Sequence, residues 1–498
     1  MKEPSPGESF DASDGGLDAE GSDLPSASLA AAVSPRRAAP GGVAYDSLHE
    51  IWSLSWPVMG SQVLLNAVGL IDIAMVGRLG AKSVAAVGYA TQFFHLSQSV
   101  LFAVGFATVA LMAQAIGAGD PLRARHALAA ALWVAVGAAG VLTAAMLAAP
   151  EAMLLALGAE PDVARAAIPY LQLVVGSSLL LSVGMTLEFG LRADRDSRTP
   201  MLIAVIVTAV KIAGNAVFIF GAGPFPRLEL VGAGLASFAS QVVGLLLFAV
   251  VVVRSTDASP LALQLRDFAA ARGMVSQVVR LAVPSVGERL ANTLALLAYF
   301  KVLSVYGSVA IATYTVGIRL LAFTWIPGVA LGTAAATLVG QSLGAGRRAT
   351  AARAGWRATG LALGVAGVLG GACALMPRFL AGLFTDDPVL VSELVPFLIV
   401  LALVQPFLQS HFTLSGAHRG AGDTLTPFVA ATIGNWAIRV PLAFVFAHHL
   451  GAPVLWIWLV IFGDHIVRAV WLGTSFARGV RGLPGVRGAR APERPHSR

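Results

Sequence analysis

A few charged and amide side chains interrupt long apolar stretches of this chain, and these residues could do chemistry. Asp72 stands in the run GLIDIAMVG, and Glu288 stands in a second apolar run. Lys211 and Asn215 are four residues apart, so on a helix they would share one face. A carboxylate there could take up a proton or hold a small cation. Charge inside an apolar segment is costly, so each of these residues is a functional hypothesis.

Because an unpaired charge inside a membrane is unfavourable, each of these charged residues is expected to have a partner. A lysine near the middle of a membrane must find a negative partner or lose its proton, and we expect Asp72 to pair with Lys211, with another acid as the open alternative. Glu288 lies one turn before Asn292, and burial would favour its neutral form, as proton exchange requires. The alternative for Glu288 is an ion pair with Arg289 or with a cation of another helix.

Other polar and aromatic residues are candidates for gating, packing or substrate contact. The four-residue spacings of Glu188 with Arg192 and of Asp464 with Arg468 predict intrahelical ion pairs with gating or structural roles. Aromatic faces attract flat organic cations, and an amide can line the same pocket. We therefore expect a substrate cavity that includes four further residues: Asn292, Tyr299, Tyr314 and Trp325.

The composition indicates that membrane-spanning helices position these side chains. Of 498 residues, 56% are hydrophobic and 12% are charged, with mean hydropathy +0.76. Soluble domains carry about 25% charged residues, and a bilayer core needs about 20 apolar residues per helix. The chain is predicted to be an all-α polytopic membrane protein with twelve spans, near 51–76, 84–118, 124–149, 163–191, 199–222, 230–253, 274–304, 309–344, 349–375, 389–418, 427–448 and 454–477.

The two halves of the chain repeat each other. MAQAIGAGD and VGQSLGAGR share a Gln-x-x-Gly-Ala-Gly pattern that begins at Gln114 and at Gln341. The same offset relates RADRDSRTP, which begins at Arg192, to RGAGDTLTP, which begins at Arg419. An offset of six spans keeps both copies in one orientation, which predicts two pseudo-symmetric six-helix lobes related by an axis along the membrane normal. Gln114, Gln341 and Arg419 are assigned gating or structural roles, and the glycines are interpreted as helix caps.

Five regions follow from these patterns. They are a disordered acidic N-terminal segment (1–48), an N-terminal lobe (49–253), a cytoplasmic linker (254–273), a C-terminal lobe (274–477) and a disordered basic tail (478–498). Most of the 34 Lys and Arg fall in the N-terminal segment, the even-numbered loops and the tail. The positive-inside rule then places both termini in the cytoplasm, in a bacterial-type inner membrane. The formal charge of +7 is explained by this topology, so no nucleic acid partner is expected.

The motifs together resemble a known transporter family. LIDIAMVGRLGAKSVAAVG (70–88), the doubled Gln-x-x-Gly-Ala-Gly, the doubled Arg-Asp-Thr-Pro pattern and NWAIRVPLAF (435–444) look like the multidrug and toxic compound extrusion (MATE) transporters. The resemblance covers about residues 50–475 and implies two six-helix lobes that form a V. It also implies export of amphiphilic, often cationic, organic compounds in exchange for sodium ions or protons. Asp72 matches the aspartate that the family uses for cation coupling in its first span.

This chain departs from the family pattern at two acids. One branch of the family carries an asparagine and then an aspartate in span 5, where this chain has Lys211 and Asn215. Another branch has a glutamate eight residues after the proline of span 7, where this chain has Asn292. A lysine beside Asp72 would repel sodium, so we expect the proton as the coupling ion. Asp72 would be its main carrier, or Glu288 if the lysine keeps Asp72 charged.

The sequence bears on three classes of function. An exporter of amphiphiles is the leading interpretation, and a flippase for lipid-linked or polysaccharide substrates is the alternative. A membrane enzyme would need clustered carboxylates or a nucleophile with its base, and no such motif is present within a span. With one cysteine, Cys373, no intrachain disulfide is possible. We expect a monomer that binds a small-molecule amphiphile within the lipid bilayer and needs no cofactor apart from the proton or sodium ion.

Overall fold

The computed structural model describes residues 46–221, 226–256 and 258–482, and long helices dominate this part of the chain. The N-lobe is built from α2 (Leu48–Gly77), α3 (Ala81–Gly117), α4 (Pro121–Ala148), α6 (Pro161–Ala193), α7 (Arg198–Phe220) and α8 (Glu229–Val253). The C-lobe begins with α10 (Arg272–Leu303), α11 (Gly307–Thr324), α12 (Ile326–Gly344), α13 (Arg348–Leu375) and α15 (Pro388–Gly420). It ends with α16 (Leu425–Ile433), α17 (Val440–Phe444) and α18 (Val454–Gly482).

These helices are long and apolar enough to cross a membrane. Eleven segments of the described chain qualify, and one of them, Arg272–Gly344, contains α10, α11 and α12 and therefore two crossings. The twelve-helix, two-lobe architecture expected from the sequence is thus the architecture of the molecule. The expectations for residues 1–45 and 483–498 lie outside the described residues, and α18 extends a few residues beyond the predicted end of its span.

Local structure differs from the predicted spans at three kinds of place. Short helices α5 (Pro150–Ala156), α9 (Leu265–Ala270) and α14 (Pro377–Gly382) lie in connections between the predicted spans. The eighth span is broken at Trp325, because Pro327 has no N–H to continue the helix. The eleventh span contains π-helical turns at Gly434–Arg439 and Val445–His449, a form that often marks functional positions.

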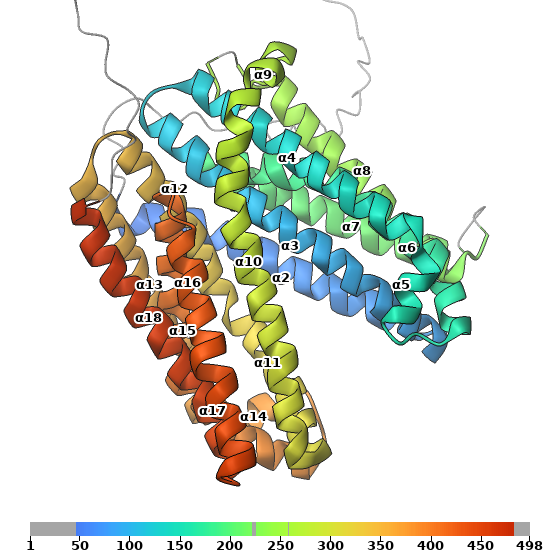
Figure 1. Cartoon of the computed structure of the whole chain (residues 1–498). Helices are drawn as coiled ribbons and strands as arrows, with labels where there is room; N and C mark the ends of the chain where they lie inside the picture. The colour runs from blue at the N-terminus through green and yellow to red at the C-terminus, as the bar shows by residue number, and fades with distance from the viewer. Residues whose placement is uncertain (1–45, 222–225, 257, 483–498) are drawn as a thin grey trace, which may run out of the picture.

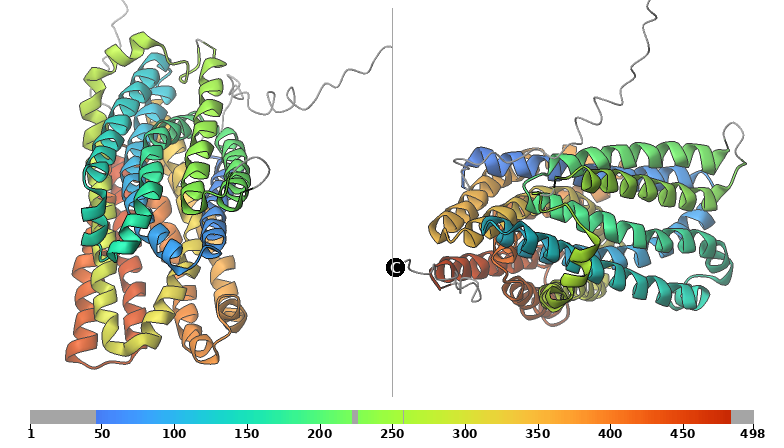
Figure 2. Two further views of the ribbon diagram at one scale, coloured as in Figure 1. Left: turned by 90° about the vertical axis from the view of Figure 1, so that its right-hand side faces the viewer. Right: turned by 90° about the horizontal axis from the view of Figure 1, so that it is seen from above.

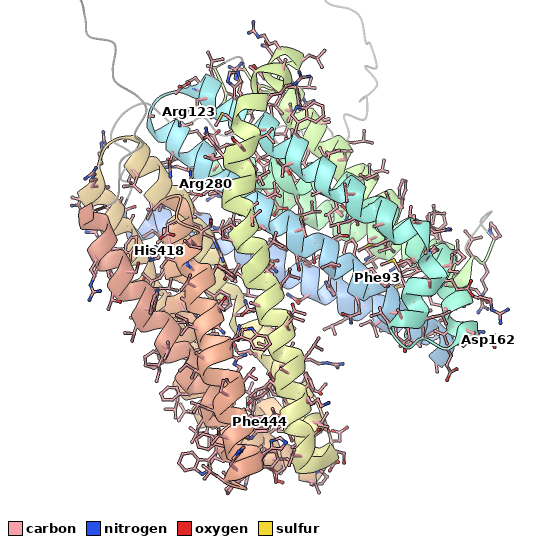
Figure 3. All side chains as sticks on the ribbon, viewed as in Figure 1. Phe93, Arg123, Asp162, Arg280, His418 and Phe444 are labelled. Atoms are coloured by element: carbon pink, nitrogen blue, oxygen red, sulfur yellow. The ribbon has the colours of Figure 1, made fainter. Side chains whose placement is uncertain are left out.

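The two lobes form a V (Figure 1). They meet near the ends of α3 and α12, and the side and top views show the same division (Figure 2). Figure 3 labels residues at both ends of the molecule: Arg123 and His418 lie toward the junction, whereas Asp162 and Phe444 lie at separate lobe tips. We call the junction the closed end. The two lobes diverge toward the opposite end, which we call the open end of the V (Figure 1).

Reciprocal hydrogen bonds join the lobes at the closed end. Gln114 of α3 donates to the carbonyl of Gly420 in the C-lobe at 3.0 Å. Gln341 of α12 donates to the carbonyl of Ala193 in the N-lobe at 2.7 Å. Both donors and both acceptors are related by the offset of the sequence repeat. This exchange of equivalent contacts is what a two-fold relation produces.

Glycines bring α3 and α12 into contact at this junction. A Cβ on Gly117 would collide with the backbone carbonyl of Gln341, and a Cβ on Gly344 would collide with that of Gln114. Gly119 and Gly346 have φ of +73° and end their helices, as the cap interpretation requires. That interpretation was incomplete for Gly117 and Gly344, because these two permit the close approach of the lobes.

A side chain at either position should force the closed end apart. We expect Gly117→Val and Gly344→Val to lengthen the distance between spin labels at positions 123 and 349, in a Cys373→Ser background. Gly137→Val and Gly364→Val are matched controls, since a Cβ at these repeat-related glycines meets nothing within 4 Å. Pulsed electron resonance measures the distance, and an unchanged distance in the first two variants would show that the junction does not depend on these glycines.

Candidate functional site

The N-lobe holds one polar cluster where α2 packs against α7. Lys211 forms an ion pair with Oδ2 of Asp72, and the Asn215 amide donates to Oδ1 of the same carboxylate at 2.6 Å. The side chains of Lys211 and Asp72 are 22% and 20% exposed, whereas Asn215 is buried. The structure therefore brings together the three residues that the sequence grouped. All three can respond to a proton or cation that reaches the carboxylate.

A pair of amides links the corresponding helices of the C-lobe. Asn435 donates to Asn292 at 2.6 Å, and this pair has the same sequence separation, 143 residues, as Asn215 and Asp72. The bond lies between α10 and the π-helical turn after α16, the helices that correspond to α2 and α7. Relative to the offset of the doubled Gln-x-x-Gly-Ala-Gly pattern, this amide pair lies seven residues, or about two helical turns, before the positions equivalent to Asp72 and Asn215, so the two lobes do not share one site.

A buried carboxylate lies next to that amide pair and is linked to it through Arg468. Asp464 of α18 is fully buried and pairs with Arg439 and Arg468, each at 2.6 Å. Arg468 also donates to Oδ1 of Asn435 at 2.7 Å. A Cβ on Gly434 would collide with Asp464, so glycine in the π-helical turn makes room for the carboxylate. The Asp464–Arg468 pair was predicted from spacing, whereas the second cation, Arg439, was not.

Two further ion pairs lie near the closed end. Arg192 pairs with Glu188 one turn away on α6, as its spacing predicted. Glu288 of α10 pairs with Arg419 of α15 at 2.7 Å, which is the alternative of a cation from another helix. The guanidinium of Arg419 also lies 4.2 Å from the ring centre of Phe106 on α3. Glu288 therefore holds a C-lobe arginine against an N-lobe ring.

The chain matches one protein family in both halves. The family model MatE matches residues 57–217 and again residues 284–445, which together make up more than half of the chain. The chain belongs to the MATE family. Family membership makes it a polytopic membrane transporter of small molecules, rather than an enzyme.

Several MATE relatives match over nearly their full length. A protein of Thermotoga maritima named probable multidrug resistance protein NorM is 28% identical over 84% of this chain and 90% of its own. A protein of the same name from Deinococcus radiodurans is 31% identical over 82% of this chain and 91% of its own. Bacillus subtilis has a relative named uncharacterized transporter YisQ, which is 25% identical over 85% of this chain and 93% of its own.

Solved structures share the fold. A crystal structure of MATE in the bent conformation superposes with a TM-score of 0.79 at 22% identity, over 88% of this chain and 96% of its own. An outward-facing conformation of a multidrug resistance MATE family transporter gives 0.78 at 23% identity, over 86% of this chain and 96% of its own. At these identities the likeness establishes the arrangement of helices only.

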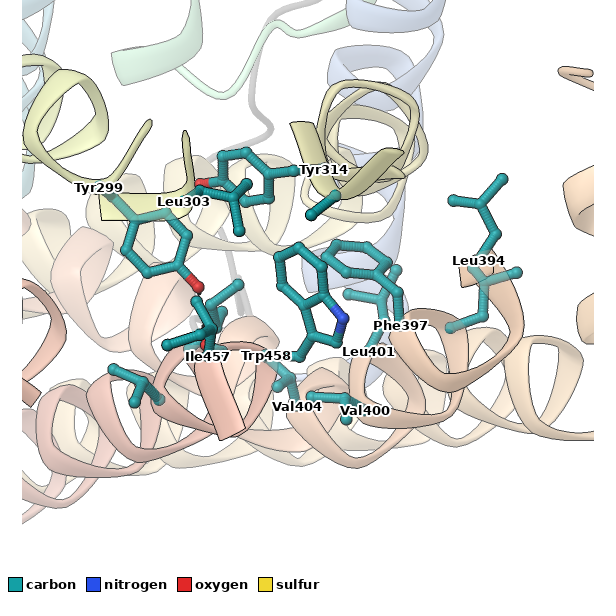
Figure 4. Close-up of a cluster of buried hydrophobic side chains, with 14 of the residues drawn as sticks. Tyr299, Leu303, Tyr314, Leu394, Phe397, Val400, Leu401, Val404, Ile457 and Trp458 are labelled. Atoms are coloured by element: carbon teal, nitrogen blue, oxygen red, sulfur yellow. Dashed lines mark hydrogen bonds between the residues drawn. The ribbon is translucent and has the colours of Figure 1, made fainter. Parts of the chain in front are cut away.

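The two tyrosine candidates of this MATE chain lie in packed surroundings. Tyr299 is fully buried and donates to the carbonyl of Ile457 at 2.7 Å. Tyr314 is 3% exposed and stacks on Trp458 with 5.8 Å between ring centres. Figure 4 shows these rings within the apolar core of the C-lobe. Their faces are occupied by protein, so the expectation that Tyr299 and Tyr314 line an open substrate cavity does not hold in this conformation.

Trp325 and Asn292 are placed differently from the two tyrosines. Trp325 is 44% exposed at the break between α11 and α12, with its ring edge-on to Phe412. Asn292 belongs to the amide pair described above and also accepts from Arg468 at 3.3 Å. The four residues expected around one cavity are thus distributed over a core, a helix break and a polar seam.

The repeated loops at the closed end use their acids to start helices. Asp196 accepts from the amide of Thr199, and Asp423 accepts from that of Thr426, each at 3.0 Å. Burial alone would raise the pKa of Asp423, but hydrogen bonds from His418 and Thr426 outweigh it, so the pKa lies below its usual range. Burial and then the charge of Asp196 raise the pKa of Asp194 to about 7. In both copies of the Asp-Thr-Pro pattern, the aspartate therefore accepts a hydrogen bond from the first turn of the following helix.

Removing the charge of Asp464 should mainly destabilise the protein. Asp464→Asn leaves Arg439 and Arg468 buried without a carboxylate, and breaking one partner of a buried pair costs about 3–5 kcal/mol. We expect a lower unfolding temperature in detergent and less protein in the membrane. Asp162→Asn is the control, because its pair with Arg165 is exposed. Wild-type stability with lost transport would instead place Asp464 in the transport cycle.

Proposed function

We propose that this MATE chain is a secondary antiporter that exports amphiphilic, cationic organic compounds in exchange for protons. The cluster of Asp72, Lys211 and Asn215 carries the proposal. It joins a carboxylate to an amine at 20–22% exposure, between two helices of one lobe. Names of relatives such as multidrug resistance protein support the class of substrate.

Proton exchange suits this cluster better than sodium binding does. An ammonium group already neutralises Asp72, so a sodium ion would have to displace it or bind beside a like charge. A proton on Asp72 would instead release Lys211. Asn215 Oδ1 is buried and has no hydrogen-bond partner among the described residues. This oxygen could accept a hydrogen bond from the protonated carboxyl group of Asp72.

Release of Lys211 would link protonation to helix movement. The ion pair and the Asn215 hydrogen bond are side-chain links between α2 and α7. Loss of the pair would leave the helices joined by apolar contacts and one amide. α2 also packs against α12 of the other lobe, so a shift of α2 would reach the lobe junction. We place the open end of the V outside and both termini in the cytoplasm of a bacterial-type inner membrane.

A flippase for lipid-linked or polysaccharide substrates is the second candidate. One observation favours it: the guanidinium groups of Arg192, Arg289 and Arg419 lie over three phenylalanine rings near the lobe junction, and only two of the three are held in ion pairs with glutamates among the described residues. The remaining positive charge could attract a diphosphate. A flippase of this kind would equilibrate its substrate without consuming a proton gradient.

Everted membrane vesicles distinguish these functions. With an acidic interior, the antiporter should accumulate ethidium, and collapse of the pH gradient should release it. A fluorescent diphosphate-linked lipid in proteoliposomes tests the flippase through chemical quenching of the outer leaflet. Lipid movement without a gradient, together with no ethidium accumulation, would contradict the proposed function and support the alternative.

A further inference from the structure

Three phenylalanines form an aromatic cluster on the N-lobe face of the closed end. Phe102 and Phe106 of α3 lie edge-on to Phe189 of α6, with ring centres 5.9 Å and 5.6 Å away. A Cβ on Gly105 would collide with the Phe189 ring, so glycine lets the ring lie against α3. Phe189 is buried, whereas Phe102 and Phe106 are partly buried and keep faces directed toward other groups.

Those faces are covered by arginines of the other lobe. Arg289 of α10 lies 4.7 Å from the ring centre of Phe102, and Arg419 lies 4.2 Å from that of Phe106. Both distances are within the range of cation–π attraction. Arg419 is neutralised by Glu288, but no ion pair forms at Arg289 among the residues that the structure describes. The two rings are therefore sites for cations, and the protein fills them with its own.

Alternating access would empty these sites. The arginines belong to the C-lobe and the rings to the N-lobe, and α10 crosses α3 at the junction (Figure 1). When the lobes separate at this end, Arg289 and Arg419 must leave the rings. Two aromatic faces then open toward the side from which the exported compound arrives.

We propose that Phe102 and Phe106 form a subsite for the cationic group of the exported compound, and that Arg289 and Arg419 displace that group when the closed end forms again. This inference rests on the proposed export of organic cations. A transported ligand shifts a conformational equilibrium only through different affinities for the two states. The arginines supply this difference, because only in the closed state do both occupy the rings and does the charge of Arg289, unpaired among the described residues, repel a second cation.

Tetraphenylphosphonium is the probe, and purified protein in proteoliposomes is the system. Phe102→Leu and Phe106→Leu keep apolar bulk but lose the aromatic face, and each should raise KM for the probe about tenfold with little change in maximal rate. Phe106→Tyr should keep the wild-type KM. Phe93→Leu is the matched control, because Phe93 lies on the same helix in the N-lobe core.

Removing the arginine that covers Phe102 should change the affinity for the probe in the opposite direction. Arg289→Met removes the competing cation, so equilibrium binding of tetraphenylphosphonium should tighten about tenfold while the maximal transport rate falls. Unchanged KM in both leucine variants, or unchanged or weaker binding in Arg289→Met, would overturn the proposal. If the leucine variants do not fold, the Arg289→Met binding result decides alone. A wild-type protein that transports no organic cation would instead refute the proposed function.

Discussion

Asp72→Asn should reduce proton-driven export to the level of vesicles that lack the protein. The substitution removes the carboxylate that takes up the proton and leaves Lys211 without its partner. The Asn215 contact can persist with an amide in place of the acid. We expect loss of ethidium accumulation under an imposed pH gradient, measured at matched amounts of membrane protein.

A double variant separates chemistry from stability in this result. An unpaired cation left in the lobe is itself destabilising, so Asp72→Asn alone could lower the amount of folded protein. Asp72→Asn combined with Lys211→Met removes both charges and should restore the unfolding temperature. It should not restore export, because no titratable group returns. Proton-driven export by the double variant would show that another residue carries the proton.

Glu288→Gln should lower the export rate while the protein remains abundant in the membrane. Glu288 holds Arg419 against Phe106, and a hydrogen bond to a charged partner contributes about 1.5–3 kcal/mol. Its loss should destabilise the closed end relative to the conformation in which that end is open. Spin labels at positions 123 and 349 should therefore report a larger share of long distances.

The matched control for Glu288 is Glu188, another glutamate near the closed end. Glu188→Gln also removes a carboxylate beside an arginine, but Glu188 and Arg192 lie on one helix. That pair does not hold a C-lobe group against the N-lobe, so the distance distribution should change less. Loss of folded Glu288→Gln protein would assign Glu288 to a purely structural ion pair, and unchanged export would remove it from the cycle.

Features that depend on neighbouring positions were predictable from the sequence. The lengths of the apolar segments predicted the membrane spans, and the internal repeat predicted the two lobes. Both features can be read from the order of residues along the chain. The ion pair of Glu188 with Arg192 follows from helix geometry alone. The pairing of Lys211 with Asp72 was also expected, since a buried ammonium needs a carboxylate and few were available.

Contacts that depend on helix rotation and lobe packing were not predictable. Arg439 reaches Asp464 through a π-helical turn, which changes the direction of side chains after Asn435. The only signal was a lone arginine four residues after an asparagine within an apolar span. Tyr299 and Tyr314 carry the same rings whether they face a cavity or a core, so their type could not reveal their burial. The stacking of Arg289 on Phe102 depends on how two distant halves meet.

Reconstituted transport under one gradient at a time tests the central claim most directly. Proteoliposomes with purified protein should accumulate ethidium when their lumen is acidic and sodium is equal on both sides. The Asp72→Asn protein should not accumulate it under the same gradient. A sodium gradient at equal pH should drive no accumulation in the wild type, because Lys211 occupies the carboxylate. Full accumulation driven by sodium alone, with no pH difference, would contradict proton exchange at Asp72.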